Sequence, residues 1–100
     1  MQNKILRFLG LARRSGNLIS GYNTCIHYIN KNKIKLLIIA EDASENTKKK
    51  FIQLALKKKI KYIVWGNKDD LSHSIGMDNR SVIGIDNENF VSAILAEFEK

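Results

Sequence analysis

The residues of this chain with the most specific chemical potential are Gly21, Asn23 and Thr24, in a Gly-Tyr-Asn-Thr segment that is expected to begin a helix. A glycine at a helix start lets another backbone approach closely, and the free amides of the first turn can bind phosphate or base acceptors. The side chain of Asn23 can both donate to and accept from a base edge. The chemistry alone supports a nucleic-acid contact and an ordinary helix N-terminus equally well.

Glu41 and Asp42 form the only carboxylate pair at the end of a predicted strand. Such a pair could hold magnesium for phosphodiester chemistry, but helix capping and loop hydrogen bonds explain both residues more simply. His27 and His73 fall on separate predicted helices and make a poor metal site. No glycine-rich phosphate loop, nucleophile elbow or zinc-protease motif is present. We therefore expect no catalytic residues, no metal and no cofactor.

Two lysine triplets, residues 48–50 and 57–59, lie on one predicted helix. A solvated helix face and a surface that attracts phosphate without selecting sequence explain them about equally well. Tyr62 and Trp65 could stack on bases, although their place in a predicted core strand favours packing. Cys25 is the only cysteine, so it cannot form an internal disulfide, and its apolar surroundings suit a small core residue.

The composition predicts one domain with a polyanionic partner. The chain has 100 residues, 44% of them hydrophobic, a formal net charge of +7 and a pI near 9.7. Residues 1–61 carry 14 basic and 3 acidic side chains, whereas residues 62–100 carry 3 and 7, so a basic face is expected. No stretch is apolar for long enough to be a signal peptide or a membrane span. We expect a cytoplasmic protein without a membrane partner.

The element that must position these groups is the segment Leu36–Ala40, a run of five apolar residues that stops at two carboxylates. It predicts a strand buried on both faces, in the middle of a sheet, with ligands expected at its carboxyl end. Asp42, through capping-box spacing with Glu45, or Ser44 is expected to cap the helix that follows. The core stripe of that helix is predicted to be Phe51, Ile52, Leu54, Ala55 and Leu56.

Other segments alternate between helical and extended patterns. An extended segment is predicted over residues 17–20, and further strands over 61–65 and 81–85; further helices are predicted over 3–14, 21–31, 69–75 and 89–98. On the helix that begins near Gly21, Ile26 and Ile29 are expected to face the core, with Cys25 or Tyr22 beside them. This alternation predicts the α/β class, with a three-layer α/β/α sandwich around a mixed sheet of about four strands.

Three segments resemble the kink-turn RNA-binding ribosomal protein family of L-seven-Ae and L-thirty-e type. Within that family they look most like the small bacterial YlxQ-like branch. They are Ser20–Thr24, Leu36–Lys50, and Leu71–Gly76 with the loop that follows. The most specific part is Ala-Glu-Asp-Ala-Ser with its downstream Asn-Thr-Lys-Lys. The resemblance covers nearly the whole chain and implies a single RNA-binding domain, residues 1–100. Its target would be kink-turns, RNA duplexes bent sharply at a bulge beside tandem sheared G·A pairs.

The resemblance also implies which residues bind RNA. A Gly-x-Asn-Glu helix start enters the widened groove in the family, which by position is Gly21, Asn23 and Thr24 here. A basic residue that meets phosphate one turn later falls on His27, and a lysine before the short helix falls on Lys68. The loop that covers the flipped-out nucleotide corresponds to Met77, Asp78, Asn79 and Arg80.

Two of these positions depart from the family pattern. Thr24 replaces a glutamate that accepts from guanine N–H groups, and His27 replaces a permanently charged lysine. Each departure costs about 1–3 kcal/mol if the contact is otherwise made as in the family. Weaker or altered RNA selectivity is therefore one of the expectations.

We therefore expect a non-catalytic, monomeric protein that recognises and stabilises kink-turn-like structured RNA near the translation apparatus. Ribosomal RNA is one candidate ligand, and DNA binding is not expected. A second hypothesis is a protein-interaction adaptor that kept the fold and lost specific RNA recognition. Thr24, His27 and the acidic C-terminal third motivate this second hypothesis.

Overall fold

Strand β2 (Leu36–Ile39) is the buried strand at the centre of the molecule, and all four of its residues are inaccessible to solvent. The computed structural model describes residues 3–100. In it β2 lies between β4 (Val82–Ile85), to which it is antiparallel, and β3 (Lys61–Val64), to which it is parallel. Strand β1 (Leu18–Ser20) pairs antiparallel with the other side of β4. The predicted buried, mid-sheet strand is confirmed, and the sheet order is β1-β4-β2-β3.

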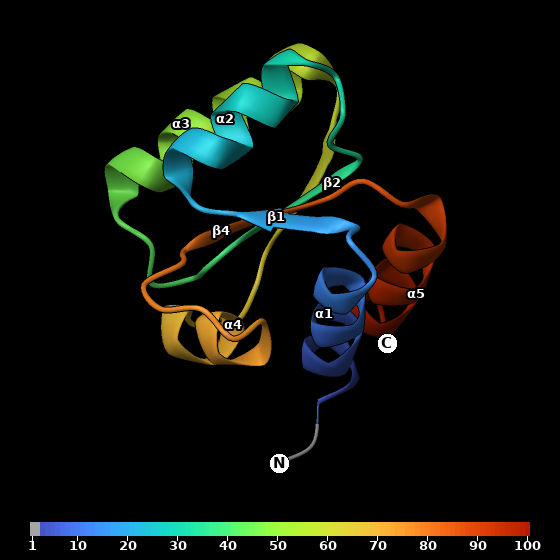
Figure 1. The fold of residues 1–100 in the computed structure, drawn as a ribbon. Helices are drawn as coiled ribbons and strands as arrows, with labels where there is room; N and C mark the ends of the chain where they lie inside the picture. The colour runs from blue at the N-terminus through green and yellow to red at the C-terminus, as the bar shows by residue number, and fades with distance from the viewer. Residues whose placement is uncertain (1–2) are drawn as a thin grey trace.

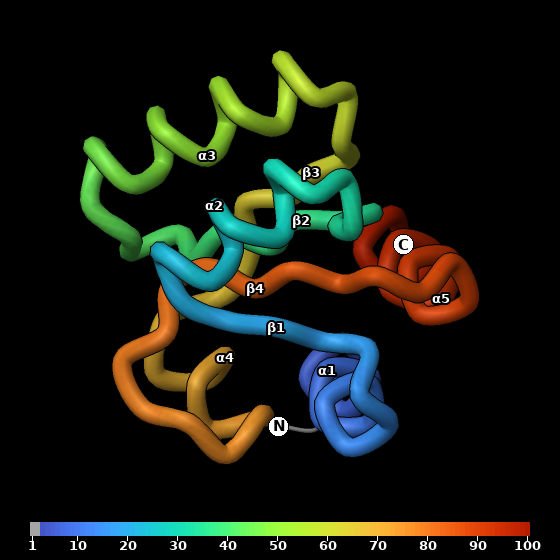
Figure 2. Tube along the Cα trace, turned by 45° about the horizontal axis from the view of Figure 1, so that its top comes forward, coloured from blue at the N-terminus to red at the C-terminus, as the bar shows by residue number. Residues whose placement is uncertain are grey.

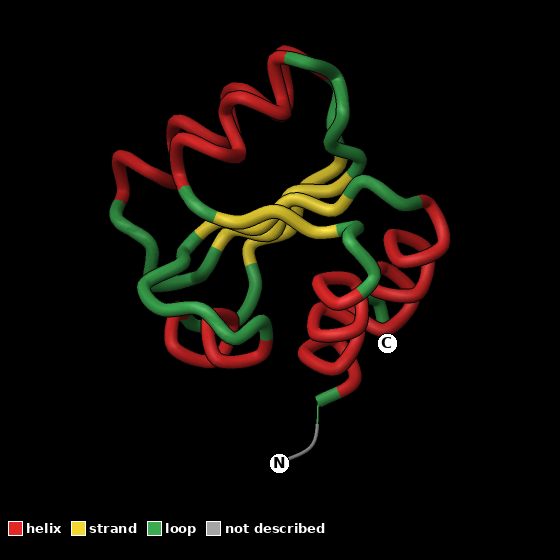
Figure 3. The backbone as a smooth tube through the Cα atoms, in the orientation of Figure 1, coloured by secondary structure: helices red, strands yellow, loops and turns green. Residues whose placement is uncertain are grey.

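Helices cover both faces of this sheet (Figures 1 and 3). One layer contains α2 (Tyr22–Asn30) and α3 (Glu45–Lys58); the other contains α1 (Lys4–Arg14), α4 (Lys68–Ser74) and α5 (Glu88–Phe98). The turned view in Figure 2 separates α2 and α3 from α1 and α4 in the same way. The predicted three-layer α/β/α sandwich with a mixed sheet is confirmed. Within residues 3–100, no helix combines the length and apolarity needed to cross a bilayer.

Helix α3 contributes Phe51 and Ala55 to the core, where both are fully buried, while Ile52 and Leu54 are half-buried against it. The prediction that Leu56 belongs to the same stripe is wrong, because its side chain is 66% exposed. Five residues of an α-helix turn through about 140° beyond a full revolution, so Leu56 points away from the side of Phe51.

The cap of α3 is Ser44, whose hydroxyl accepts a hydrogen bond from the amide of Thr47 at 3.1 Å. The capping-box interpretation of Asp42 is therefore wrong. Instead, Asp42 Oδ1 accepts from the backbone amide of Lys68 at 2.8 Å and ties the β2–α3 loop to the start of α4. A carboxylate at the first turn of α4 also suits the positive end of that helix.

Three connections between helices and strands meet at one end of the sheet. Strands β1, β2 and β3 run in the same direction and β4 runs against them, so the carboxyl ends of three strands lie beside the amino end of the fourth. The amide of Gly21 donates to Val82 O at 3.0 Å, and the amide of Ala40 donates to Ser81 O at 2.9 Å. The β1–α2, β2–α3 and α4–β4 connections therefore meet there, on the left of Figure 1.

We predict that Phe51→Ala lowers the free energy of unfolding by about 3–5 kcal/mol, because it removes a fully buried ring from the contact between α3 and the sheet. Leu56→Ala on the same helix should change it by less than about 0.5 kcal/mol. Urea unfolding followed by circular dichroism measures both. A large loss for Leu56→Ala would mean that this side chain is buried in solution.

Candidate nucleic-acid interface

Gly21 starts α2 in a conformation that favours glycine, with φ at 100° and ψ at 156°. No side chain caps this helix within the described residues, so its first-turn amides remain available to an outside acceptor. A Cβ at Gly21 would lie 3.9 Å from Cδ, Nε and Cζ of Arg80, which shows how closely this arginine approaches the helix start. The N-terminus of α2 and the guanidinium of Arg80 thus form one region of positive electrostatic potential.

The solvent-facing side of α2 carries Asn23, Thr24 and His27, all exposed. Spacings of three and four residues place them on neighbouring turns of one helical face. The opposite side packs Cys25 and Ile29, both fully buried, against the sheet. The exposed polar side chains of this face therefore take no part in packing α2 against the sheet. They can contact an external ligand.

Beside the start of α2 lies a hollow of about 410 Å³, which we call the Arg80 hollow. It brings together four of the residues expected from the sequence to bind RNA: Gly21, Lys68, Asn79 and Arg80. Asn23, Thr24 and His27 continue from its edge along α2, and Met77 and Asp78 precede it in the α4–β4 connection without lining it. The remaining lining residues are Tyr22, Asp42, Ala43, Ser44, Thr47 and Ser81.

Arg80 carries the least satisfied polar group of the described residues. Its Nε is buried and has no hydrogen-bond partner among residues 3–100. An unpaired buried donor costs about 1–3 kcal/mol, more for a charged group, and a phosphate or carbonyl oxygen in the hollow would remove that cost. Lys68 adds a second positive charge, against a single carboxylate, Asp42, in the lining. The hollow is suited to an anionic ligand.

Ser72 fixes the backbone of Arg80 from the core side. Its hydroxyl accepts from Arg80 N at 2.8 Å and donates to Arg80 O at 3.1 Å, and its side chain is the buried polar side chain of the described core. We call this pair of hydrogen bonds the Ser72 clasp. Sequence analysis missed it, because a serine within a short helix carries no sign of a partner eight residues away.

The rest of the α4–β4 connection is held more loosely. The amide of Met77 donates to Ser72 O at 2.9 Å, and its half-buried side chain packs on the core. Asp78 and Asn79 are exposed, and Asn79 has a left-handed φ of 57°, a conformation that asparagine tolerates well. These two side chains form a polar rim beside the Arg80 hollow.

Cys25 lies beneath this site as a core residue. Burial raises the pKa of its thiol from 9.0 to about 12, and the nearby positive charge of Arg80 opposes that rise. The thiol donates weakly to Val82 O at 3.8 Å. The side chain of Cys25 is fully buried, which confirms its interpretation as a small core residue.

Sequence analysis also missed the aromatic residue of the hollow. Tyr22, offered as a possible core neighbour of Ile26 and Ile29, is 45% exposed and contacts Phe51 edge to face at 5.1 Å between ring centroids. Tyr62 and Trp65, weighed as stacking residues, are half-buried and pack against the core, as expected. The sequence signal that could have placed Tyr22 in this site is its position directly after Gly21, at the start of the helix.

The two carboxylates at the end of β2 lie in different surroundings. Glu41 is exposed, and Asp42 accepts from Lys68. Within residues 3–100, no three histidine, cysteine, aspartate or glutamate side chains gather closely enough to hold an ion.

The sequence matches the model of the ribosomal protein L7Ae/L30e/S12e/Gadd45 family over residues 3–95. It is 32% identical over 88 residues to the RNA-binding protein YlxQ of Bacillus subtilis (strain 168), covering 88% of both chains. It is 47% identical over 49 residues to the RNA-binding protein YlxQ of Enterococcus faecium, covering 49% of this chain and 48% of that one.

Two solved structures share the fold. A protein with unknown function from Bacillus halodurans C superposes with a TM-score of 0.94 at 30% identity, covering 99% of this chain and all of that one. The 15.5kD RNA binding protein of Giardia lamblia superposes with a TM-score of 0.79 at 20% identity, covering 99% of this chain and 91% of that one. At that identity the second likeness concerns the fold alone.

We predict that Ser72→Ala lowers the free energy of unfolding by about 1–3 kcal/mol, because it leaves the amide and carbonyl of Arg80 without partners. Hydrogen exchange at the Arg80 amide should accelerate as well. Ser74→Ala is the matched control: its hydroxyl donates at 2.7 Å to Leu71 O within the same helix, so Arg80 should be unaffected. Urea unfolding and amide exchange test both variants, and an unchanged Arg80 amide in Ser72→Ala would contradict the clasp.

Proposed function

The chain belongs to the ribosomal protein L7Ae/L30e/S12e/Gadd45 family, and we propose that it binds and stabilises kink-turn-like structured RNA through the Arg80 hollow and the exposed face of α2. The observation that carries this proposal is that residues from separate segments meet in one hollow. Gly21, Lys68 and the adjacent pair Asn79 and Arg80 come from three separate segments, yet they line one hollow around a guanidinium nitrogen that is buried and has no partner among the described residues.

In the proposed complex, the start of α2 enters a widened groove of the bent RNA. Asn23 then meets base edges, while the uncapped amides of the first turn and the Arg80 guanidinium donate hydrogen bonds to nearby phosphate oxygens. A splayed nucleotide lies in the hollow, where Tyr22 offers an aromatic surface for stacking. A basic protein that fits only the bent RNA shifts its conformational equilibrium toward the bend.

No reaction, metal or cofactor enters this proposal. The YlxQ relatives are named as RNA-binding proteins, and the chain is a non-catalytic protein of the same family. Because the family is named for ribosomal proteins, we extend the proposal to an RNA of the translation apparatus in the cytoplasm, with ribosomal RNA as the first candidate and one copy of the domain per RNA site.

The first test is a calorimetric titration with a generic kink-turn RNA, beside the same RNA with its sheared G·A pairs replaced by Watson–Crick pairs. Asn23→Ala and Arg80→Ala should each weaken binding by at least about tenfold, since each removes a contact to the bent RNA. Lys58→Ala should have an effect within about twofold, because Lys58 lies about 16 Å along α3 from Thr47, at the far end from the hollow.

The expected result is tight binding that disappears when the G·A pairs are replaced. Equal, steeply salt-dependent binding to both RNAs, with similar losses in all three variants, would mean that the lysines bind phosphate without reading the motif. No binding to either RNA would exclude the proposal and leave the adaptor hypothesis.

A second prediction concerns the two departures from the family pattern. Thr24→Glu and His27→Lys should each tighten binding to the kink-turn RNA by about tenfold, because they restore an acceptor for guanine and a permanent positive charge. Asn30→Glu, which adds a carboxylate further along the same helix, should not strengthen binding. If neither substitution strengthens binding in the same titration, then this face of α2 does not read guanines.

A further inference from the structure

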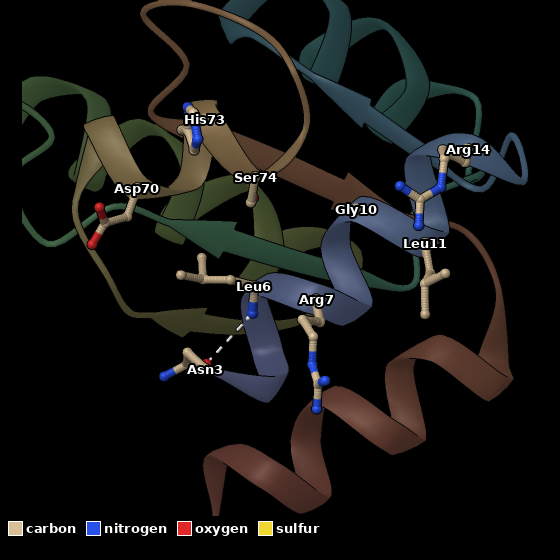
Figure 4. A pocket seen from close by; sticks show the side chains of 9 residues that line it. All are labelled: Asn3, Leu6, Arg7, Gly10, Leu11, Arg14, Asp70, His73 and Ser74. Carbon is tan, nitrogen blue, oxygen red and sulfur yellow. Dashed lines mark hydrogen bonds between the residues drawn. The ribbon is translucent and has the colours of Figure 1, made fainter. Parts of the chain in front are cut away.

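A second concave surface lies between α1 and α4 (Figure 4). We call it the α1–α4 groove, and its volume is about 440 Å³. It belongs to the helical layer on the face of the sheet opposite α2 and α3, so it is separate from the face of α2 that is proposed to read RNA (Figure 1).

Gly10 lines this groove at the point where α1 and α4 pack most closely. A Cβ at Gly10 would lie 3.0 Å from the carbonyl oxygen of Ser74, so α1 and α4 touch at this point and no larger residue fits without a shift. Leu6 and Leu11, the leucines that line the groove, project from α1 in different directions (Figure 4).

The α1 wall of the groove is basic and has no internal counterions. Arg7 and Arg14 are exposed, and neither guanidinium forms an ion pair within the described chain. Arg13 of the same helix is different, because its Nη1 donates to Ile75 O at 2.6 Å and links α1 to the end of α4. Two of the three arginines of this helix are thus available to a partner.

Apolar surface accompanies this charge. Leu11 is 46% exposed, and Leu6 is half-buried in the groove. On the α4 wall, Asp70 already accepts from the side-chain amide of Asn67 at 3.0 Å. The wall formed by α1 therefore combines leucines with uncompensated arginines, the complement of a surface that combines apolar residues with carboxylates.

We propose that the α1–α4 groove is a docking surface for an acidic amphipathic helix of a partner protein. Apolar side chains of that helix contact Leu6 and Leu11, and carboxylates about two turns apart pair with Arg7 and Arg14. The stripe from Asn3 to Arg14 is about 16 Å long, which matches about three turns of a helix. This is the helix-in-groove mode of recognition, in which apolar anchors bind and charges set the orientation.

The lining favours a peptide over a second RNA site. Nucleic-acid surfaces for unpaired bases use aromatic platforms, and no phenylalanine, tyrosine or tryptophan lines this groove. The carboxylate of Asp70 would repel a phosphate backbone that followed the groove, whereas a partner helix can turn a neutral residue toward it. The exposed leucines have no role in contacts to phosphate.

The test uses the full chain labelled with nitrogen-15 and a synthetic helical peptide of about three to four turns, with leucines at three- and four-residue spacing flanked by glutamates. Amide chemical shifts should change in α1 and α4, with saturation in the micromolar range typical of small transient interfaces.

Arg7→Glu with Arg14→Glu should weaken binding by at least about tenfold. Leu11→Gln should also weaken it. Lys57→Glu with Lys58→Glu, the same change of charge on α3, should leave it within about twofold.

Four results would overturn the proposal: no binding at millimolar peptide, equal binding of a scrambled peptide of the same composition, equal losses in the two double-charge variants, or shifts that lie outside α1 and α4. A short RNA duplex that produces the same shifts in α1 would also overturn it, in favour of a second RNA surface. All substituted side chains are exposed or partly exposed, and thermal melting checks that each variant is folded.

Discussion

The structure depends on the insertion of the last strand into the middle of the sheet. Strand β4 pairs with β1 on one side and with β2 on the other, so residues more than forty positions apart in the chain must meet before the sheet is complete. This pairing places the amide of Gly21 against Val82 O and brings Arg80, just before β4, against the start of α2. Without β4 in this position, neither the core nor the Arg80 hollow would exist.

The same topology explains why the candidate site is built from short, separate segments. Each strand is only three or four residues long, so the loops at one end of the sheet are held within a small area. Hydrogen bonds from side chains then hold each loop: Asp42 accepts from the start of α4, Ser44 caps α3, and Ser72 binds the backbone of Arg80. Each segment that is already held by such hydrogen bonds loses less conformational entropy when a ligand binds.

The positive charge of the chain has several different roles. Lys48 lies 3.6 Å from Glu45 on the surface of α3, an exposed pair of small energetic consequence. Arg13 links two helices, and Arg80 lies partly buried beside the helix start. Arg7 and Arg14 have no partner within the described residues. The net charge of +7 therefore includes structural cations, cations of the candidate RNA surface and exposed arginines on the opposite side of the sheet.

The sequence by itself determined the buried strand Leu36–Ile39, the order of helices and strands, the basic character of the chain and the glycine at the start of α2. These features follow from local periodicity, charge and turn preferences, which act over a few neighbouring residues. Only the tertiary structure decided the strand order, the choice between Asp42 and Ser44 as the cap, the exposure of Leu56 and Tyr22, and the Ser72 clasp. Each depends on a partner that local pattern does not identify, such as the amide of Lys68, 26 residues from Asp42. Such contacts are selected by the packing of the whole fold.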